Sequence, residues 1–189
     1  MLRQTRYVAL LRGINLGPHN RISMDVLRSL IIDAGWADPQ TYIQSGNVIF
    51  TAPLSAAAVE ARLEKMINVE FGLTIPVIVR SAADWSGCVA ANPFPRQTKA
   101  TPQYVLLAVS KSAPKSDAEA ALQERAARNE KVRRIGDTLY IYFGGGVGRS
   151  KLTPAVLDRL VGSPVTARNW LTVLKLKELS AQTNDKINR

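Results

Sequence analysis

Apolar and polar positions along the chain recur with two different periods. The run Tyr7–Leu11 is apolar without interruption, as in a buried strand, whereas Met24, Leu27 and Ile31 recur at helical spacing. The first part of the chain predicts, in order, a strand at Tyr7–Leu11, a helix from the cap Ser23 to about Gly35, a hairpin of Thr41–Ile43 and Val48–Phe50, a helix capped by Ser55, and a strand at Ile75–Val79.

A second series with the same order begins near residue 104. Ser81 caps a connecting helix that extends to about Ala91, and the polar stretch 96–103 indicates a linker. The alanine-rich segment 116–129 favours a helix. The elements predicted after the linker are a strand at Tyr104–Val109, a helix at Ser116–Asn129, a hairpin of Lys131–Ile135 and Thr138–Phe143, a helix at 154–161, a short strand at Pro164–Ala167 and a final helix at about 169–180.

Both series have the order β-α-β-β-α-β, which is the ferredoxin-like pattern. The turns Gly46-Asn47 and Gly136-Asp137 fall at equivalent places in the two series, which suggests a duplication. We therefore expect an α+β fold made of two ferredoxin-like units packed together, with a C-terminal helix. The expected boundaries are 1–82 for the first unit, 83–103 for a connecting helix and linker, and 104–189 for the second unit with the C-terminal helix.

The charge of the chain bears on its partners. The 189 residues carry a formal net charge of +10, and the excess lies at the two ends of the sequence. Residues 1–21 contribute +4 and residues 144–189 contribute +5, whereas 13 basic and 12 acidic side chains nearly cancel in residues 22–143. If the ends meet in space, they form a basic surface that favours phosphates or nucleic acid. The alternative is a charge that only keeps the protein in solution.

Several classes of protein are disfavoured by the residues that the chain lacks. With a single cysteine, Cys88, and a single histidine, His19, neither an internal disulfide nor a histidine- or cysteine-based metal centre is expected. No apolar run reaches the roughly 18 residues of a membrane helix, and the N-terminal residues lack a signal-peptide pattern. We expect a cytoplasmic protein that has no membrane association, metal or cofactor. The oligomeric state is left open.

The segment Gly144–Lys151 lies between a predicted strand and a predicted helix. Glycine adopts positive φ without a clash, so such a loop can turn its backbone N–H groups towards an anion, and Arg149 and Lys151 add positive charge. The spacing differs from that of the nucleotide-binding phosphate loop. The alternative is a flexible connecting loop whose charges lie in water.

Four polar clusters contain basic, amide and hydroxyl side chains and no acid. Such donor-rich sets are typical of sites for phosphate, carboxylate or a nucleic-acid backbone. The absence of carboxylates disfavours both Mg²⁺-dependent phosphoryl transfer and acid–base catalysis by paired carboxylates. The candidate ligand-binding residues are Arg12, Asn15, Gln44, Asn47, Arg80, Arg149, Ser150, Lys151, Arg168 and Asn169.

These clusters resemble a bacterial family known as "domain of unknown function 1697". The resemblance implies an α+β fold of ferredoxin-like units and implies no activity. The chain departs from the family's pattern at Gly17-Pro-His-Asn20, where a lysine is expected at His19, and at Ala167, where a threonine is expected. The matching segments are Leu10–Asn15, Thr41–Val48, Val77–Ser81, Asn92–Phe94, Gly146–Leu152, Arg168–Trp170 and Thr172–Lys175.

Three classes of function are compatible with these residues. The first is a module that binds an anionic ligand, either a phosphorylated metabolite or nucleic acid, with Tyr140 and Tyr142 on one sheet face as a surface for bases. The second is a metal-independent enzyme acting on a phosphorylated or acyl substrate, with Ser150 as nucleophile but no evident general base. The third is a structural or interaction protein in which the polar clusters hold the two units together and Arg168-Asn169-Trp170 bonds the glycine-rich loop. Arg12 and Arg80, which both follow strands, can likewise simply bond loop carbonyls.

Overall fold

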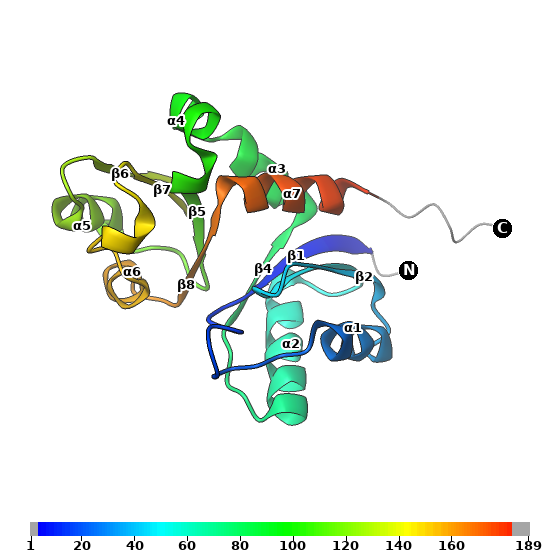
Figure 1. Cartoon of the computed structure of the whole chain (residues 1–189). Helices are drawn as coiled ribbons and strands as arrows, with labels where there is room; N and C mark the ends of the chain where they lie inside the picture. The colour runs from blue at the N-terminus through cyan, green and yellow to red at the C-terminus, as the bar shows by residue number, and fades with distance from the viewer. Residues whose placement is uncertain (1–3, 183–189) are drawn as a thin grey trace. The chain divides into compact units, whose positions relative to one another are not determined.

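The computed structural model describes residues 4–182. They form two compact units: the first contains the described residues up to Gly87 together with those from Lys175 onwards, and the second is Cys88–Leu174. Each unit has a four-stranded antiparallel sheet with helices (Figure 1). The α+β fold with a C-terminal helix, expected from the sequence, is confirmed. The boundaries expected after residues 82 and 103 remain predictions.

The first unit has the element order β-α-β-β-α-β. Its sheet has the strand order β2-β3-β1-β4, and all neighbouring strands are antiparallel. This is the order expected of a ferredoxin-like sheet. The elements are β1 (Thr5–Leu11), α1 (Met24–Asp33), β2 (Ala37–Tyr42), β3 (Asn47–Ala52), α2 (Ala56–Phe71), β4 (Val77–Ser81) and α3 (Ala82–Ala90), which continues into the second unit.

Both helices of the first unit begin where the sequence predicts. The hydroxyls of Ser23 and Ser55 accept hydrogen bonds from the backbone N–H groups of Val26 and Ala58, each at 3.4 Å. Their apolar faces pack on one side of the sheet with alternate residues of the strands, and each fully buried Leu or Ile contributes about 1.5–3 kcal/mol. Residues 0–1% exposed in this core include Ala9, Leu11, Leu27, Ile31, Val48, Phe50, Leu63 and Ile67.

Side chains of α2 close the outer edge of β4. The carboxylates of Glu60 and Glu64 accept hydrogen bonds from the backbone N–H groups of Val79 and Val77 at 2.8 and 2.9 Å. A sheet edge otherwise presents a row of unpaired backbone groups that can pair with another chain. The two glutamates therefore block this edge of the sheet.

The second unit repeats the order and the strand pairing. Its sheet has the order β6-β7-β5-β8, again antiparallel throughout. The stretch 96–103, expected to be a linker, lies mostly in a short helix and a 3₁₀ turn. The elements are α4 (Pro95–Ala100), η1 (Pro102–Tyr104), β5 (Val105–Ser110), α5 (Ala118–Arg125), β6 (Glu130–Ile135), β7 (Thr138–Phe143), η2 (Val147–Arg149), α6 (Pro154–Val161), β8 (Val165–Asn169) and α7 (Trp170–Ala181), which continues into the first unit.

Helix α5 ends at Arg125, four residues before the predicted end. Its cap residue Ala126 is extended, and the N–H of Ala127 donates to the buried Glu130 carboxylate at 2.8 Å. Because Glu130 takes this donor, the helix does not continue.

Helix side chains also close both edges of this sheet. The three bonds, each 2.8 Å long, run from the N–H of Arg134 to Glu119, from that of Val132 to Gln123 and from that of Val165 to Asp158.

Arg6 on β1 is a charged residue with incomplete hydrogen bonding. Its Nη1 donates to the Asp38 carbonyl at 3.0 Å and to the Thr51 hydroxyl at 3.4 Å. Its Nε and Nη2 are buried and have no partner among the described residues. Burial lowers the pKa of Arg6, although the nearby Asp38 carboxylate raises it. A buried charge with unused donors contributes little to stability.

We expect Arg6→Met to leave the free energy of unfolding unchanged or to raise it by about 1 kcal/mol, because an apolar chain of similar length needs no partners. Arg28→Met is the matched control, since Arg28 bonds Asp25 and Thr41, and it should lower the stability by about 1 kcal/mol. Urea denaturation of both variants measures the difference. A larger loss for Arg6→Met than for Arg28→Met contradicts the prediction.

No helix among residues 4–182 is long and apolar enough to cross a membrane.

Candidate functional site

The expected site residues are divided between the two units. Arg12, Asn15, Gln44, Asn47 and Arg80 belong to the first unit, and the remaining five belong to the second. Each group is described within its own unit.

Asn15 holds the loop that follows β1. It has a positive φ of 54°, which asparagine tolerates better than most residues. Its Nδ2 donates to the carbonyls of Ile22 at 3.1 Å and Gln44 at 2.8 Å, and its Oδ1 accepts from the N–H of Ile22 at 3.0 Å. Both amide hydrogens are thus used inside the protein. The side chain fixes the loop and ties it to the turn at Gln44.

Asn47 has a similar role in that turn. Its side chain is buried, and its Nδ2 donates to the Tyr42 carbonyl and to the Ser45 hydroxyl, both at 3.0 Å. The Gly46 carbonyl accepts from the N–H of Leu11 at 2.8 Å, so the turn is anchored to the end of β1. Both amide hydrogens of Asn47 are thus used to hold the turn together.

A cavity of about 580 Å³ lies between this turn and the beginning of α1. The Arg21 side chain on its wall is exposed and makes no hydrogen bond or ion pair with the described residues. The Gln44 side chain is likewise exposed and unbonded within residues 4–182. The cavity is lined by Asn15, Gly17, Arg21, Ile22, Ser23, Gln44 and Phe71.

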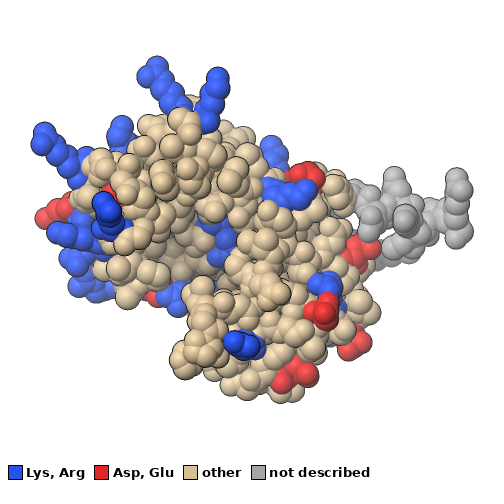
Figure 2. Space-filling view, in the orientation of Figure 1, with Lys and Arg blue, Asp and Glu red and all other residues tan. Residues whose placement is uncertain are grey.

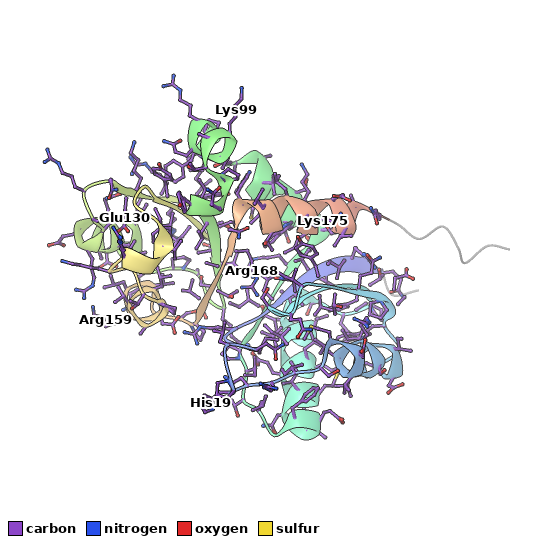
Figure 3. The ribbon with its side chains drawn as sticks, viewed as in Figure 1. His19, Lys99, Glu130, Arg159, Arg168 and Lys175 are labelled. Carbon is purple, nitrogen blue, oxygen red and sulfur yellow. The ribbon has the colours of Figure 1, made fainter. Side chains whose placement is uncertain are left out.

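Arg12 and Arg80 are half-buried, and both take part in interactions within the protein. The backbone N–H of Arg12 donates to the Pro76 carbonyl at 3.0 Å, and Nη1 of Arg80 donates to the Val79 carbonyl at 2.9 Å. Neither side chain lines the cavity. His19 is exposed and lies in the loop between β1 and α1, where Figure 3 labels it.

In the second unit, the glycine-rich loop approaches a neighbouring backbone closely. A Cβ on Gly144 would lie 2.5 Å from the Asn129 carbonyl oxygen, so packing explains this glycine. The Ser150 hydroxyl accepts from the N–H of Leu152 at 3.0 Å and so stabilises the loop. Arg149 and Lys151 are exposed and have no bonding partner within the described part of the chain. These two cations are therefore the groups in the loop that remain available to a ligand.

Arg168 and Asn169 are bonded within the second unit. Nη1 of Arg168 donates to the Thr166 hydroxyl at 2.8 Å and to the Ala167 carbonyl at 3.0 Å. Burial lowers the pKa of Arg168 to about 10. The Asn169 carbonyl oxygen accepts from the N–H of Thr172 at 2.9 Å, at the beginning of α7. Figure 3 shows Arg168 on β8, the strand that leads into this helix.

Sequence reasoning missed Arg21. The position of Arg21 in the sequence could have indicated it, because Arg21 stands two residues before the cap Ser23 and therefore at the N-terminus of α1. An arginine there can share an anion with the N–H groups of the first helical turn. Arg21 lies outside the segments that resemble the family.

The second unit carries most of the excess charge. Residues Cys88–Leu174 contain 13 Lys or Arg and 6 Asp or Glu, a net charge of +7, which leaves +3 for the rest of the chain. Figure 2 shows basic side chains crowded over α4, α5 and β6, all of the second unit. Counted along the sequence, the excess positive charge lies at the two ends. Helix α4 and strand β6 do not show in that count, because they belong to residues 22–143, which are nearly neutral in sum.

Comparisons with known proteins are consistent with this fold. The model of the family "Protein of unknown function (DUF1697)" matches residues 4–140. A solved structure, conserved bacterial protein SP0830 from Streptococcus pneumoniae, is similar with a TM-score of 0.74 and 22% sequence identity, over 94% of this chain and 99% of that chain. At this identity the likeness shows the fold alone. No curated protein matches the chain.

Proposed function

This chain belongs to the family DUF1697, whose function is unknown, and we propose that it binds a small phosphate-bearing anion in the cavity beside α1. The observation that carries the proposal is Arg21: an exposed guanidinium on the cavity wall with no bonding partner within residues 4–182. An arginine presents paired N–H donors whose geometry matches a phosphate or carboxylate group.

The N-terminus of α1 adds to the positive potential of this cavity. The first N–H groups of a helix lack partners within the helix, and the peptide dipoles place partial positive charge there. Ser23 caps the helix through the N–H of Val26, which leaves the N–H groups before it for a ligand. The one acid in the first turn, Asp25, is paired with Arg28.

The expected ligand residues then have different roles. Gln44 lies on the cavity wall with an unbonded amide and can bond the ligand directly. Asn15 positions Gln44 through the hydrogen bond to its carbonyl. Arg149 and Lys151 offer a second set of exposed cations in the other unit.

Binding is favoured over catalysis by the residues around the cavity. The lining includes no carboxylate, imidazole or thiol, so it lacks a side chain that could serve as general base. The Ser150 hydroxyl, the candidate nucleophile, is bonded to the N–H of Leu152.

Thermal unfolding with inorganic phosphate, a nucleoside monophosphate and a sugar phosphate tests the proposal. A ligand at about 100 times its dissociation constant should stabilise the protein by roughly 2.7 kcal/mol. We expect Arg21→Ala to weaken binding at least about tenfold, because it removes a charge-assisted hydrogen bond. Gln44→Ala should weaken binding about threefold.

Lys65→Ala is the control, since Lys65 is an exposed cation on α2 in the same unit and lies outside the cavity lining. It removes the same charge and should leave the affinity unchanged. Equal affinities of Arg21→Ala and Lys65→Ala would refute the site, and no stabilisation by any of these ligands would favour a structural role for the polar clusters.

A further inference from the structure

Two tyrosines of the second unit lie beside the glycine-rich loop. A Cβ on Gly144 would lie 3.2 Å from Cε1 of Tyr142, and one on Gly146 would lie 3.9 Å from Cε1 of Tyr104. Both tyrosines are half-buried. Because the glycines carry no side chains, they do not cover the rings.

The position of the Tyr142 ring is fixed by its neighbours. The Phe94 ring lies against it, with centroids 6.4 Å apart and planes tilted by 47°. A ring held in this way loses little conformational entropy when a ligand binds to it, which favours stacking.

Free cations flank these rings. Lys131 on β6 is the residue directly opposite Tyr142 on β7, so the two side chains lie on the same face of the sheet. Arg149 follows Gly146 by three residues, a span of at most about 11 Å. Both cations are exposed, and neither forms an ion pair within residues 4–182. We call the set formed by Tyr104, Lys131, Tyr142, Gly144, Gly146 and Arg149 the Tyr142 surface.

Three acidic side chains of the unit have partners other than the two cations of the Tyr142 surface. Glu119 and Asp137 are in ion pairs with Arg133 and Arg134. Glu130 is buried and accepts from the N–H of Ala127. These three acids therefore do not neutralise Lys131 or Arg149.

Tyr140 offers no further surface for bases. Tyr140, expected from the sequence to share an exposed face with Tyr142, is fully buried, and its hydroxyl donates to the Cys88 carbonyl at 2.7 Å. Burial raises the pKa of Tyr140 well above its usual range. The two half-buried rings, Tyr104 in η1 and Tyr142 in β7, lie beside the glycine-rich loop.

We propose that the Tyr142 surface binds single-stranded nucleic acid. Aromatic rings beside a positively charged groove are the usual means of holding single strands, because every base has a face that can stack and every nucleotide carries a phosphate. Bases stack on Tyr104 and Tyr142, and phosphates lie at Lys131 and Arg149. A duplex keeps its bases stacked inside and cannot use the two rings. This interaction lies beyond the phosphate site of the first unit and does not depend on it.

Fluorescence anisotropy with a labelled oligothymidylate of about 20 nucleotides tests the proposal on the full chain. The logarithm of the affinity should fall linearly with the logarithm of the salt concentration. Lys131→Ala/Arg149→Ala should weaken binding at least about tenfold and make the salt slope shallower by about 1.4, the share of two phosphate contacts on a single strand. Tyr104→Leu should weaken binding about tenfold and leave the salt slope unchanged.

Arg159→Ala/Lys65→Ala is the matched control. Arg159 lies on α6, which packs on the other face of this sheet, and the double variant removes the same total charge. It should change the affinity less than about twofold, as should Arg21→Ala, which separates this proposal from the cavity of the first unit. Tyr142→Leu, checked for folding by thermal unfolding, repeats the test at the second ring. Equal losses in the two double variants, full binding after Tyr104→Leu, or equal affinity for a duplex would each overturn the proposal.

Discussion

Gly46→Ala is expected to lower the free energy of unfolding by about 3 kcal/mol. Gly46 has a φ of +79°, and a non-glycine residue in this left-handed region costs about 1–2 kcal/mol. The added Cβ would also lie 2.7 Å from Cβ of Leu11 and 2.9 Å from Cδ1 of Ile14, both core residues. Overpacking of this kind costs about 1–3 kcal/mol more.

Gly13→Ala separates the two contributions. Gly13 has a similar φ of +67°, but a Cβ there meets nothing within 4 Å. Gly13→Ala should therefore lower the free energy of unfolding only by the cost of the left-handed backbone conformation, about 1 kcal/mol. Urea denaturation of both variants, with equal m-values, measures the difference. If Gly46→Ala loses no more than Gly13→Ala, Leu11 and Ile14 do not confine the turn.

Gly144→Ala is expected to lower the stability by about 2 kcal/mol. Its φ is outside the left-handed region, so the effect comes from space alone: the Cβ would lie 2.5 Å from the Asn129 carbonyl oxygen. A backbone atom cannot rotate away as a side chain can, so the glycine-rich loop or the turn before β6 has to move. The loss should appear as a lower midpoint of thermal unfolding.

Gly148→Ala in the same loop is the control for Gly144→Ala. A Cβ on Gly148 meets nothing within 4 Å, and its φ needs no glycine. Alanine there should leave the stability unchanged or raise it by about 0.5 kcal/mol, because it restricts the unfolded chain. Equal losses at the two positions would mean that Asn129 is not the reason for Gly144.

The sequence predicted the elements well because their signals are local. Serine caps followed by helical spacing located α1 and α2, and Gly162 marked the end of α6, where it has a φ of +87°. Alternation of apolar residues located β7. Helix α5 was predicted too long because its end depends on the Glu130 carboxylate, which accepts from the N–H of Ala127. Helix propensity does not include this contact.

The roles of individual polar residues could not be predicted in the same way. Asn15, Asn47 and Ser150 are residue types typical of a ligand site, yet their side chains bond carbonyls, N–H groups or hydroxyls of their own or a neighbouring loop. Conversely, Glu60 and Glu64 look like solvent charges at helical spacing and are acceptors for β4. Which partner a polar side chain meets is decided by tertiary structure, and local sequence does not contain it.

The glutamates, glutamine and aspartate along the sheet edges limit how this protein can recognise others. Many proteins capture an extended peptide by adding it to a sheet as a further strand. Here β4, β6 and β8 already have helix side chains on outer N–H groups. The fourth edge, β2, is irregular: it contains Pro39, and its pairing shifts between Ala37 and Gln40. Strand addition is therefore disfavoured on all four edges, and recognition of partners falls to the loops and the side chains that they present.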